Sequence, residues 1–167
     1  FTIDGRETTP VADGQNMFID PATGQPYSFP TAVTSGLSVG VPGTLATWQR
    51  ALARWGRFDL ARDLQPAINV ADQGFVVDPT FREFTRENQS RFAQFTSTRD
   101  LFLSGGALPE VGSVFRNPDL ADTYRQIARD GTGALYGGRI GADIVDAVHN
   151  LPLAPDATLT PIPGPMT

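Results

Sequence analysis

The sequence predicts a mainly α fold with a short extended N-terminal part. Apolar residues recur at helical spacing over residues 44–56. Farther along, Asp78-Pro79 offers a capping side chain followed by a proline at the first position of a helix. Residues 1–43, by contrast, are rich in Gly, Pro, Thr and Asp, which favour turns and extended chain over helices.

These observations divide the chain into three parts. We expect an extended or loop segment over 1–43, a helical domain over 44–150 and a Pro-rich linker over 151–167. Proline recurs along the last part, and because proline lacks an N–H group, that part is expected to form neither a helix nor a central strand. Within the first part, residues 1–3 and 17–30 are predicted to be short extended pieces.

Two helices are predicted at the start of the helical domain. The first runs from Thr44, a candidate N-cap, to Gly56, which ends it. The next starts at the candidate cap Asp59. We expect Pro66 to open a separate helical piece at its first turn, where the missing N–H is harmless, and Gly74 to close that piece. The apolar stripe of the first helix consists of Leu45, Trp48, Leu52 and Trp55.

The middle of the chain is predicted to hold one long helix and an irregular segment. The helix follows Asp78-Pro79 within residues 76–95. Residues 101–115 alternate and turn, which indicates an irregular excursion or a weak hairpin. The apolar stripe of the helix is expected to consist of Phe81, Phe84, Phe92 and Phe95, with Asn88 between them.

Two more helices are predicted before the Pro-rich part. Asn117-Pro118 repeats the pairing of a cap with a proline, and Gly131 ends the helix that follows. The last helix is expected within residues 137–150. The residues predicted to face inward are Leu120, Tyr124, Ile127 and Ala128 on the first of these helices and Ile140, Ile144, Ala147 and Val148 on the second.

Composition excludes several classes of function. The chain has no Cys and one His, so disulfides, thiolate metal sites and a Cys nucleophile are excluded, and no metal or cofactor is expected. All 13 basic residues are Arg, they are mixed with acidic residues, and the net charge is −5, which argues against a nucleic-acid groove. No apolar run approaches the roughly 18 residues that a membrane span needs, so no span is predicted.

Two constellations of ionisable residues have ordinary structural interpretations. His149 lies near the end of the last predicted helix, where an imidazole can bond the terminal carbonyls and complement the helix dipole. Glu83 and Glu87 are four residues apart and resemble a catalytic carboxylate pair. Arginines interleave with them, however, which is typical of an exposed helix face with ion pairs. We therefore assign no catalytic residue.

Two N-terminal features remain as candidates for binding. The stretch GLSVGVPGT, residues 36–44, has three glycines and leads into a helix, so it could hold an anion. It lacks the lysine and spacing of a phosphate-binding loop, which favours a tight structural loop. Arg6 lies between Asp4 and Glu7 and before Pro10. It is either part of a local salt bridge or a bidentate clamp for a substrate carboxylate, oriented by its acidic neighbours.

Several segments in order resemble the gamma-glutamyltransferase (gamma-glutamyltranspeptidase) family. DGRETTP, starting at Asp4, is similar to the family's REtAP motif. GLSVGVPGT and the helices after it resemble the stretch that runs from V-P-G to P-A-x-x-x-A-x-x-G-F. NPDLADTYRQIARDGTGALYGG, starting at Asn117, is similar to a later segment with a D-L-A helix and a Y-x-G. Order and spacing agree over roughly residues 2–150.

The resemblance implies a fold and a chemistry that residue counting does not. It implies the helical portion of an N-terminal-nucleophile hydrolase, whose parent has an αββα fold and cleaves itself into a large and a small subunit. The new N-terminal Thr of the small subunit attacks the gamma-glutamyl amide, using its own amino group as base. Water or an amino acid or peptide acceptor then resolves the acyl-enzyme. Family members are typically periplasmic, extracellular or at the cell surface.

Within the resemblance, Arg6 is the residue that binds the α-carboxylate of the gamma-glutamyl group. Glu7 matches the Glu of the motif, with a supporting role, and Thr9 stands where the family usually has Ala. The family's nucleophile lies in a T-x-H sequence, whereas Ala147 and Val148 precede the single histidine here. We therefore expect an internal fragment of the large subunit that is inactive by itself.

The predicted function is that of a gamma-glutamyltransferase fragment acting on glutathione and related amides within its parent. Its expected partners are such a substrate, the small subunit of the same precursor and, through exposed apolar surface, a second copy of the fragment. The related cephalosporin or glutaryl acylases are an alternative. A free-standing, non-catalytic helical interaction module is the alternative from a different class.

Overall fold

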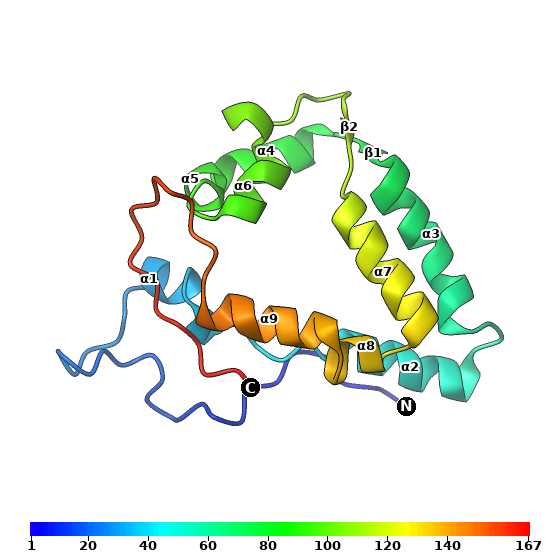
Figure 1. Cartoon of the computed structure of the whole chain (residues 1–167), viewed down its shortest axis with the longest axis horizontal. Helices are drawn as coiled ribbons and strands as arrows, with labels where there is room; N and C mark the ends of the chain where they lie inside the picture. The colour runs from blue at the N-terminus through cyan, green and yellow to red at the C-terminus, as the bar shows by residue number, and fades with distance from the viewer.

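The computed structural model describes residues 1–167 and confirms a mainly α fold. Its small sheet lies in the middle of the chain, at residues 75–76 and 114–115, whereas the N-terminal part forms isolated bridges and no strand. Figure 1 shows the helices in three groups that surround the centre of the molecule like the sides of a triangle. The N-terminal segment runs along the lower edge, and the C-terminal tail runs along the left side towards α5 before it ends near the lower edge. The elements are α1 (Phe29–Val33), η1 (Gly36–Ser38), α2 (Thr44–Trp55), α3 (Leu60–Gln73), β1 (Phe75–Val76), α4 (Pro79–Glu87), α5 (Gln89–Phe92), α6 (Thr96–Phe102), η2 (Ser104–Gly106), β2 (Val114–Phe115), α7 (Pro118–Asp130), α8 (Gly133–Tyr136) and α9 (Arg139–His149).

The main core lies between α3 and α7, which run side by side in opposite directions (Figure 1). Leu64 and Ile68 of α3 are each 4% exposed, and Ala121 of α7 is fully buried. Burying one Leu or Ile side chain contributes about 1.5–3 kcal/mol, so this contact holds the helical part together. The other buried members of the cluster are Leu45, Ala71, Ile127 and Ala134.

A second, aromatic cluster forms where the two strands meet α4 and α6. β1 and β2 are antiparallel, with Phe75 opposite Phe115. The Phe81 ring lies 4.9 Å from the Phe115 ring and 5.1 Å from the Phe75 ring, within the range in which aromatic pairs attract. Phe102 stacks on Phe115 at 5.4 Å. The segment 101–115 is thus an irregular excursion, as predicted, and its strand pairs with residues 75–76 instead of forming a local hairpin.

Three of the predicted N-caps are confirmed. The side chains of Asp59, Asp78 and Asn117 each accept a hydrogen bond from the backbone N–H three residues later, at 2.8, 2.7 and 3.0 Å. Gly74 and Gly131 end their helices with φ of 91° and 73°, a conformation that favours glycine.

Other element boundaries differ from the prediction. Pro66 lies inside one continuous helix, α3, instead of opening a second piece. The long helix over 76–95 is broken at Asn88, whose side-chain amide donates to the carbonyl of Phe84 at 2.8 Å and so competes with the helical bonding. Phe84 is 61% exposed and does not belong to the buried stripe. Leu120 is also half-exposed, at 36%.

The Pro-rich segment 151–167 packs back along the molecule. Gln94 accepts two hydrogen bonds from the segment: its backbone carbonyl accepts from the Ala154 N–H at 2.8 Å, and its side-chain Oε1 accepts from the Thr158 N–H at 2.8 Å. Near the end of the chain, the Gly164 N–H donates to the Val148 carbonyl at 3.1 Å. The segment forms no helix and only one isolated bridge, between Leu153 and Phe95. It is therefore held by side-chain and backbone contacts and not by regular structure.

The chain exposes more surface than a compact domain of its size. Its accessible surface is 10838 Å², whereas a folded monomer of 17.9 kDa is expected to expose about 8,000 Å². Only 17 of the 167 residues are buried. None of the helices combines the length and the apolar composition needed to cross a membrane. Large apolar side chains at the surface include Phe29 at 78%, Phe84 at 61% and Trp55 at 55%.

Candidate functional site

The two N-terminal motifs lie against each other in the structure. Thr8 and Val41 form an isolated antiparallel bridge, with the Thr8 N–H donating to the Val41 carbonyl at 3.1 Å and the Val41 N–H to the Thr8 carbonyl at 2.8 Å. The bridge brings the segment that contains Arg6 onto the loop that leads into α2. Residues more than thirty positions apart therefore form one unit.

Glycines make this close approach possible. A Cβ on Gly40 would lie 2.7 Å from the Glu7 Cγ, and one on Gly43 would lie 2.7 Å from the Gly5 carbonyl and still closer to that of Arg6. Cβ atoms essentially never come within 3.0 Å of a non-bonded heavy atom, so a side chain at either glycine would force its neighbours to move. Gly5 in turn faces Thr47 of α2 with no room for a side chain. The glycines that sequence reasoning interpreted as structural thus set the position of the Arg6 backbone.

The Arg6 side chain points into solvent with most of its donors free. Its Nε donates to Glu7 Oε1 at 2.9 Å, and its backbone N–H donates to Asp4 Oδ1 at 3.1 Å. The two terminal nitrogens of the guanidinium have no protein partner, and the side chain is 84% exposed. Because two parallel N–H groups match the two oxygens of a carboxylate, this arrangement is able to bind a carboxylate in bidentate fashion.

Glu7 holds the guanidinium from one side. The pKa of its carboxyl is below the ordinary value, first because the carboxylate accepts from its own backbone N–H and then because the Arg6 side chain donates to it. Glu7 is consequently ionised at neutral pH. It neutralises part of the charge of Arg6 and engages Nε, the donor that a bidentate contact through the terminal nitrogens does not use.

Sequence reasoning missed a residue beside this unit, Tyr136 of α8. Its hydroxyl donates to the Pro42 carbonyl at 2.7 Å and accepts from the Ala46 N–H at 3.0 Å. α2 has no side-chain cap of its own: its N-cap is Gly43, and Thr44, the predicted cap, is the first helical residue. This tyrosine belongs to the Y-x-G motif of the sequence, but the residues near it in the sequence do not indicate that its partners are Pro42 and Ala46.

The other ionisable candidates lie apart from Arg6. His149 is exposed in the last turn of α9, where it can complement the helix dipole, and it lines an apolar cavity of about 520 Å³ with Asp146. Glu83 pairs with Arg86 at 2.5 Å on an exposed face of α4, and this hydrogen bond lowers the pKa of the glutamate. The prediction of an ion-paired face there is confirmed.

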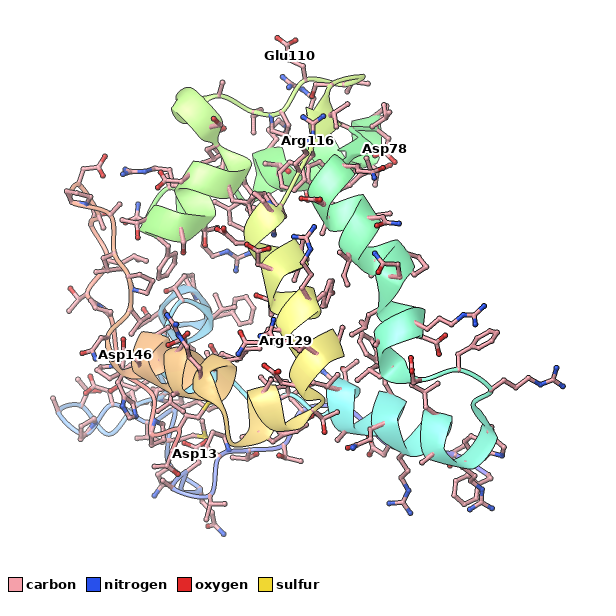
Figure 2. All side chains as sticks on the ribbon, turned by 45° about the vertical axis from the view of Figure 1, so that its right-hand side comes forward. Asp13, Asp78, Glu110, Arg116, Arg129 and Asp146 are labelled. Carbon is pink, nitrogen blue, oxygen red and sulfur yellow. The ribbon has the colours of Figure 1, made fainter.

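A carboxylate with buried oxygens lines a cavity together with Glu7 and the residues after it. Both oxygens of Asp13 are buried and accept no hydrogen bond. Asp13 lines a cavity of about 280 Å³ that Glu7 also lines. Figure 2 shows Asp13 at the bottom of the molecule in the N-terminal segment, far from Asp78, Glu110 and Arg116 at the top. Sequence reasoning did not identify this residue.

Comparisons with known proteins agree with the motifs. A family profile described as Gamma-glutamyltranspeptidase matches residues 1–152. The chain is 34% identical over 148 residues to the glutathione hydrolase proenzyme of Bacillus subtilis (strain 168), covering 89% of this chain and 25% of that protein. It is 38% identical over 114 residues to the acylase ACY 1 proenzyme of Pseudomonas sp. (strain SE83), covering 68% of this chain and 20% of that protein.

Solved structures show the same likeness in three dimensions. The crystal structure of Helicobacter pylori gamma-glutamyltranspeptidase matches with a TM-score of 0.82 and 29% identity, over 88% of this chain and 42% of that one. Cephalosporin acylase from Bacillus halodurans matches with a TM-score of 0.66 and 27% identity, over 87% and 27% of the two chains. The chain spans about a quarter of the length of the first curated relatives that it matches.

Proposed function

The chain belongs to the gamma-glutamyltranspeptidase family, and from that premise we propose that it contributes a substrate-carboxylate clamp to a complete enzyme. In this proposal the enzyme transfers or hydrolyses the gamma-glutamyl group of glutathione and related amides. Arg6 binds the α-carboxylate of that group, and Glu7 orients the guanidinium. The nucleophile, an N-terminal Thr in the family, is not among these residues, so the chain alone has no turnover.

The observation that carries the proposal is that the two terminal nitrogens of the Arg6 guanidinium, which form a fork of parallel donors, are free. Its terminal nitrogens have no protein partner, while Nε is held by Glu7 and the backbone is fixed against Gly43. A charge-assisted bond to a carboxylate is worth about 1.5–3 kcal/mol, which corresponds to roughly a 10- to 150-fold change in affinity. The test is the KM of the complete enzyme for gamma-glutamyl substrates after Arg6→Ala, because the clamp acts on binding.

A second candidate substrate class is supported by the acylase relative. The chain is 38% identical to the acylase ACY 1 proenzyme over 114 residues. A glutaryl group also ends in a carboxylate that Arg6 is able to bind. Assays of the complete enzyme on gamma-glutamyl-p-nitroanilide and on glutaryl-p-nitroanilide separate the two, since a gamma-glutamyl enzyme prefers the first substrate and a glutaryl acylase the second.

The exposed apolar surface supports the proposal of a polypeptide partner. The chain exposes 10838 Å² and leaves Phe29, Trp48 and Trp55 open to solvent. We assign this surface to contact with the small subunit of the same precursor or, in the isolated chain, with a second copy. The proposed enzyme acts in the periplasm, outside the cell or at the cell surface, as the family resemblance implies. We also propose the division of the chain into an extended segment over residues 1–43, a helical domain over 44–150 and a Pro-rich linker over 151–167.

A further inference from the structure

The N-terminus of α2 is capped from a distant part of the chain. A helix leaves its first N–H groups without internal partners, and a Ser, Thr, Asp or Asn at the N-cap usually accepts from one of them. Here the N-cap is Gly43. A side chain at this position would collide with the carbonyls of Gly5 and Arg6. The contact with the Arg6 backbone therefore excludes a local side-chain cap.

Tyr136 takes over the role of that cap. Its hydroxyl accepts from the Ala46 N–H, the third residue of α2, at 3.0 Å. The same hydroxyl donates to the Pro42 carbonyl at 2.7 Å, so its donor and one acceptor site are both used. In Figure 1, α8 lies directly beside the start of α2. One side chain thus fixes the residues on both sides of Gly43.

We propose that Tyr136 is a positioning residue for the substrate clamp. It holds Pro42 and the first turn of α2 in place, Gly43 between them supports the Arg6 backbone, and the backbone in turn directs the guanidinium. The inference rests on the proposed function of Arg6.

The exposure of Arg6 explains why its backbone matters. The side chain is 84% exposed, and Nε is the only guanidinium nitrogen with a protein partner. Few side-chain contacts therefore restrain the fork, and its direction depends on the main chain. The Thr8–Val41 bridge fixes one end of the segment, and the Gly43 contact fixes the other. Loss of the Tyr136 hydroxyl loosens the second of these restraints.

The test is Tyr136→Phe in the complete enzyme, measured with gamma-glutamyl-p-nitroanilide. We expect KM to rise about three- to tenfold, the range for loss of a neutral hydrogen bond, while kcat stays within about twofold. Tyr124→Phe is the matched control, because it makes the same chemical change on α7 at a hydroxyl that has no hydrogen-bond partner in the structure. An unchanged KM in Tyr136→Phe overturns the inference. A fall of kcat by a factor as large as the expected rise of KM also overturns it.

A double-mutant cycle separates this inference from the proposed function. If Tyr136 acts through Arg6, then Tyr136→Phe adds little to the KM of Arg6→Ala. Effects that multiply as independent factors contradict a positioning role, even when Arg6→Ala alone raises KM. If Arg6→Ala leaves KM unchanged, the clamp itself is wrong.

Discussion

The carbonyl of Arg6 lies against the Cα of Gly43 so closely that no side chain fits between them. This contact joins the start of the chain to the N-terminus of α2. It explains why the loop before α2 carries glycine, and it makes the position of one surface arginine depend on a helix thirty-eight residues later in the sequence.

We expect Gly43→Ala to destabilise the contact between the N-terminal segment and the start of α2. The added methyl group collides with backbone atoms of Gly5 and Arg6, which cannot rotate away as a flexible side chain can. Overpacking of this kind costs about 1–3 kcal/mol. Urea denaturation of the chain measures this cost. Gly14→Ala is the control, because nothing lies within 4 Å of a Cβ at that position and its φ is not positive. Equal stabilities of the two variants contradict the proposed contact.

The α3–α7 core should respond strongly to truncation. Ile68 is 4% exposed in the main cluster, so Ile68→Ala is expected to lower the free energy of unfolding by about 2–5 kcal/mol. Val70→Ala, on the same helix at 52% exposure, serves as the control and should change stability by less than about 1 kcal/mol. Thermal denaturation followed by circular dichroism measures both. A similar loss in the two variants would argue against the assigned core.

The contact between Arg99 and the C-terminal segment should weaken at low pH. Arg99 Nη1 donates to Asp156 Oδ1 at 2.7 Å. This hydrogen bond and, to a smaller extent, one from the backbone N–H of Asp156 lower the pKa of that carboxyl below its ordinary value. A carboxyl with a depressed folded pKa stabilises the folded state above its ordinary pKa, and the contribution disappears as the pH falls through the folded value. We expect lower amide protection factors in residues 151–167, that is, observed exchange corrected for the pH dependence of the intrinsic rate, below about pH 3.8 than at pH 6.

A substitution tests the same contact at neutral pH. Arg99→Gln removes the donor and should speed exchange in the segment 151–167 at pH 6 while reducing the effect of acid. Arg129→Gln is the control, because Arg129 pairs with its neighbour Asp130 and fixes no distant segment. Unchanged exchange in Arg99→Gln would show that Gln94 and the backbone contacts hold the segment without the ion pair.

The features that could be predicted from the sequence depend on neighbouring residues. Asp59, Asp78 and Asn117 each accept a hydrogen bond from the N–H three residues later, in the helix that follows directly. The residue type and its place before the helix were therefore enough to predict these caps. The sequence also singled out Arg6, through a motif whose residues are contiguous. Its role as a substrate ligand stays a prediction.

The features that could not be predicted depend on distant contacts. Thr44 has the chemistry of an N-cap, but the cap position belongs to Gly43, because the Arg6 backbone occupies the space beside it. The partner of Tyr136 is 90 residues away in sequence. The break at Asn88 reflects a side-chain bond that competes with the helix and that periodicity alone does not reveal.

The central claim is that Arg6 binds the carboxylate of the substrate, and Arg6→Ala in the complete enzyme tests it most directly. We predict that KM for gamma-glutamyl-p-nitroanilide rises by about 10- to 150-fold, and that Arg6→Lys, which keeps the charge but loses the fork, has a milder effect. Arg57→Ala, which removes an exposed arginine without an ion pair, should leave KM unchanged. A KM in Arg6→Ala equal to that of the unsubstituted enzyme would contradict the account.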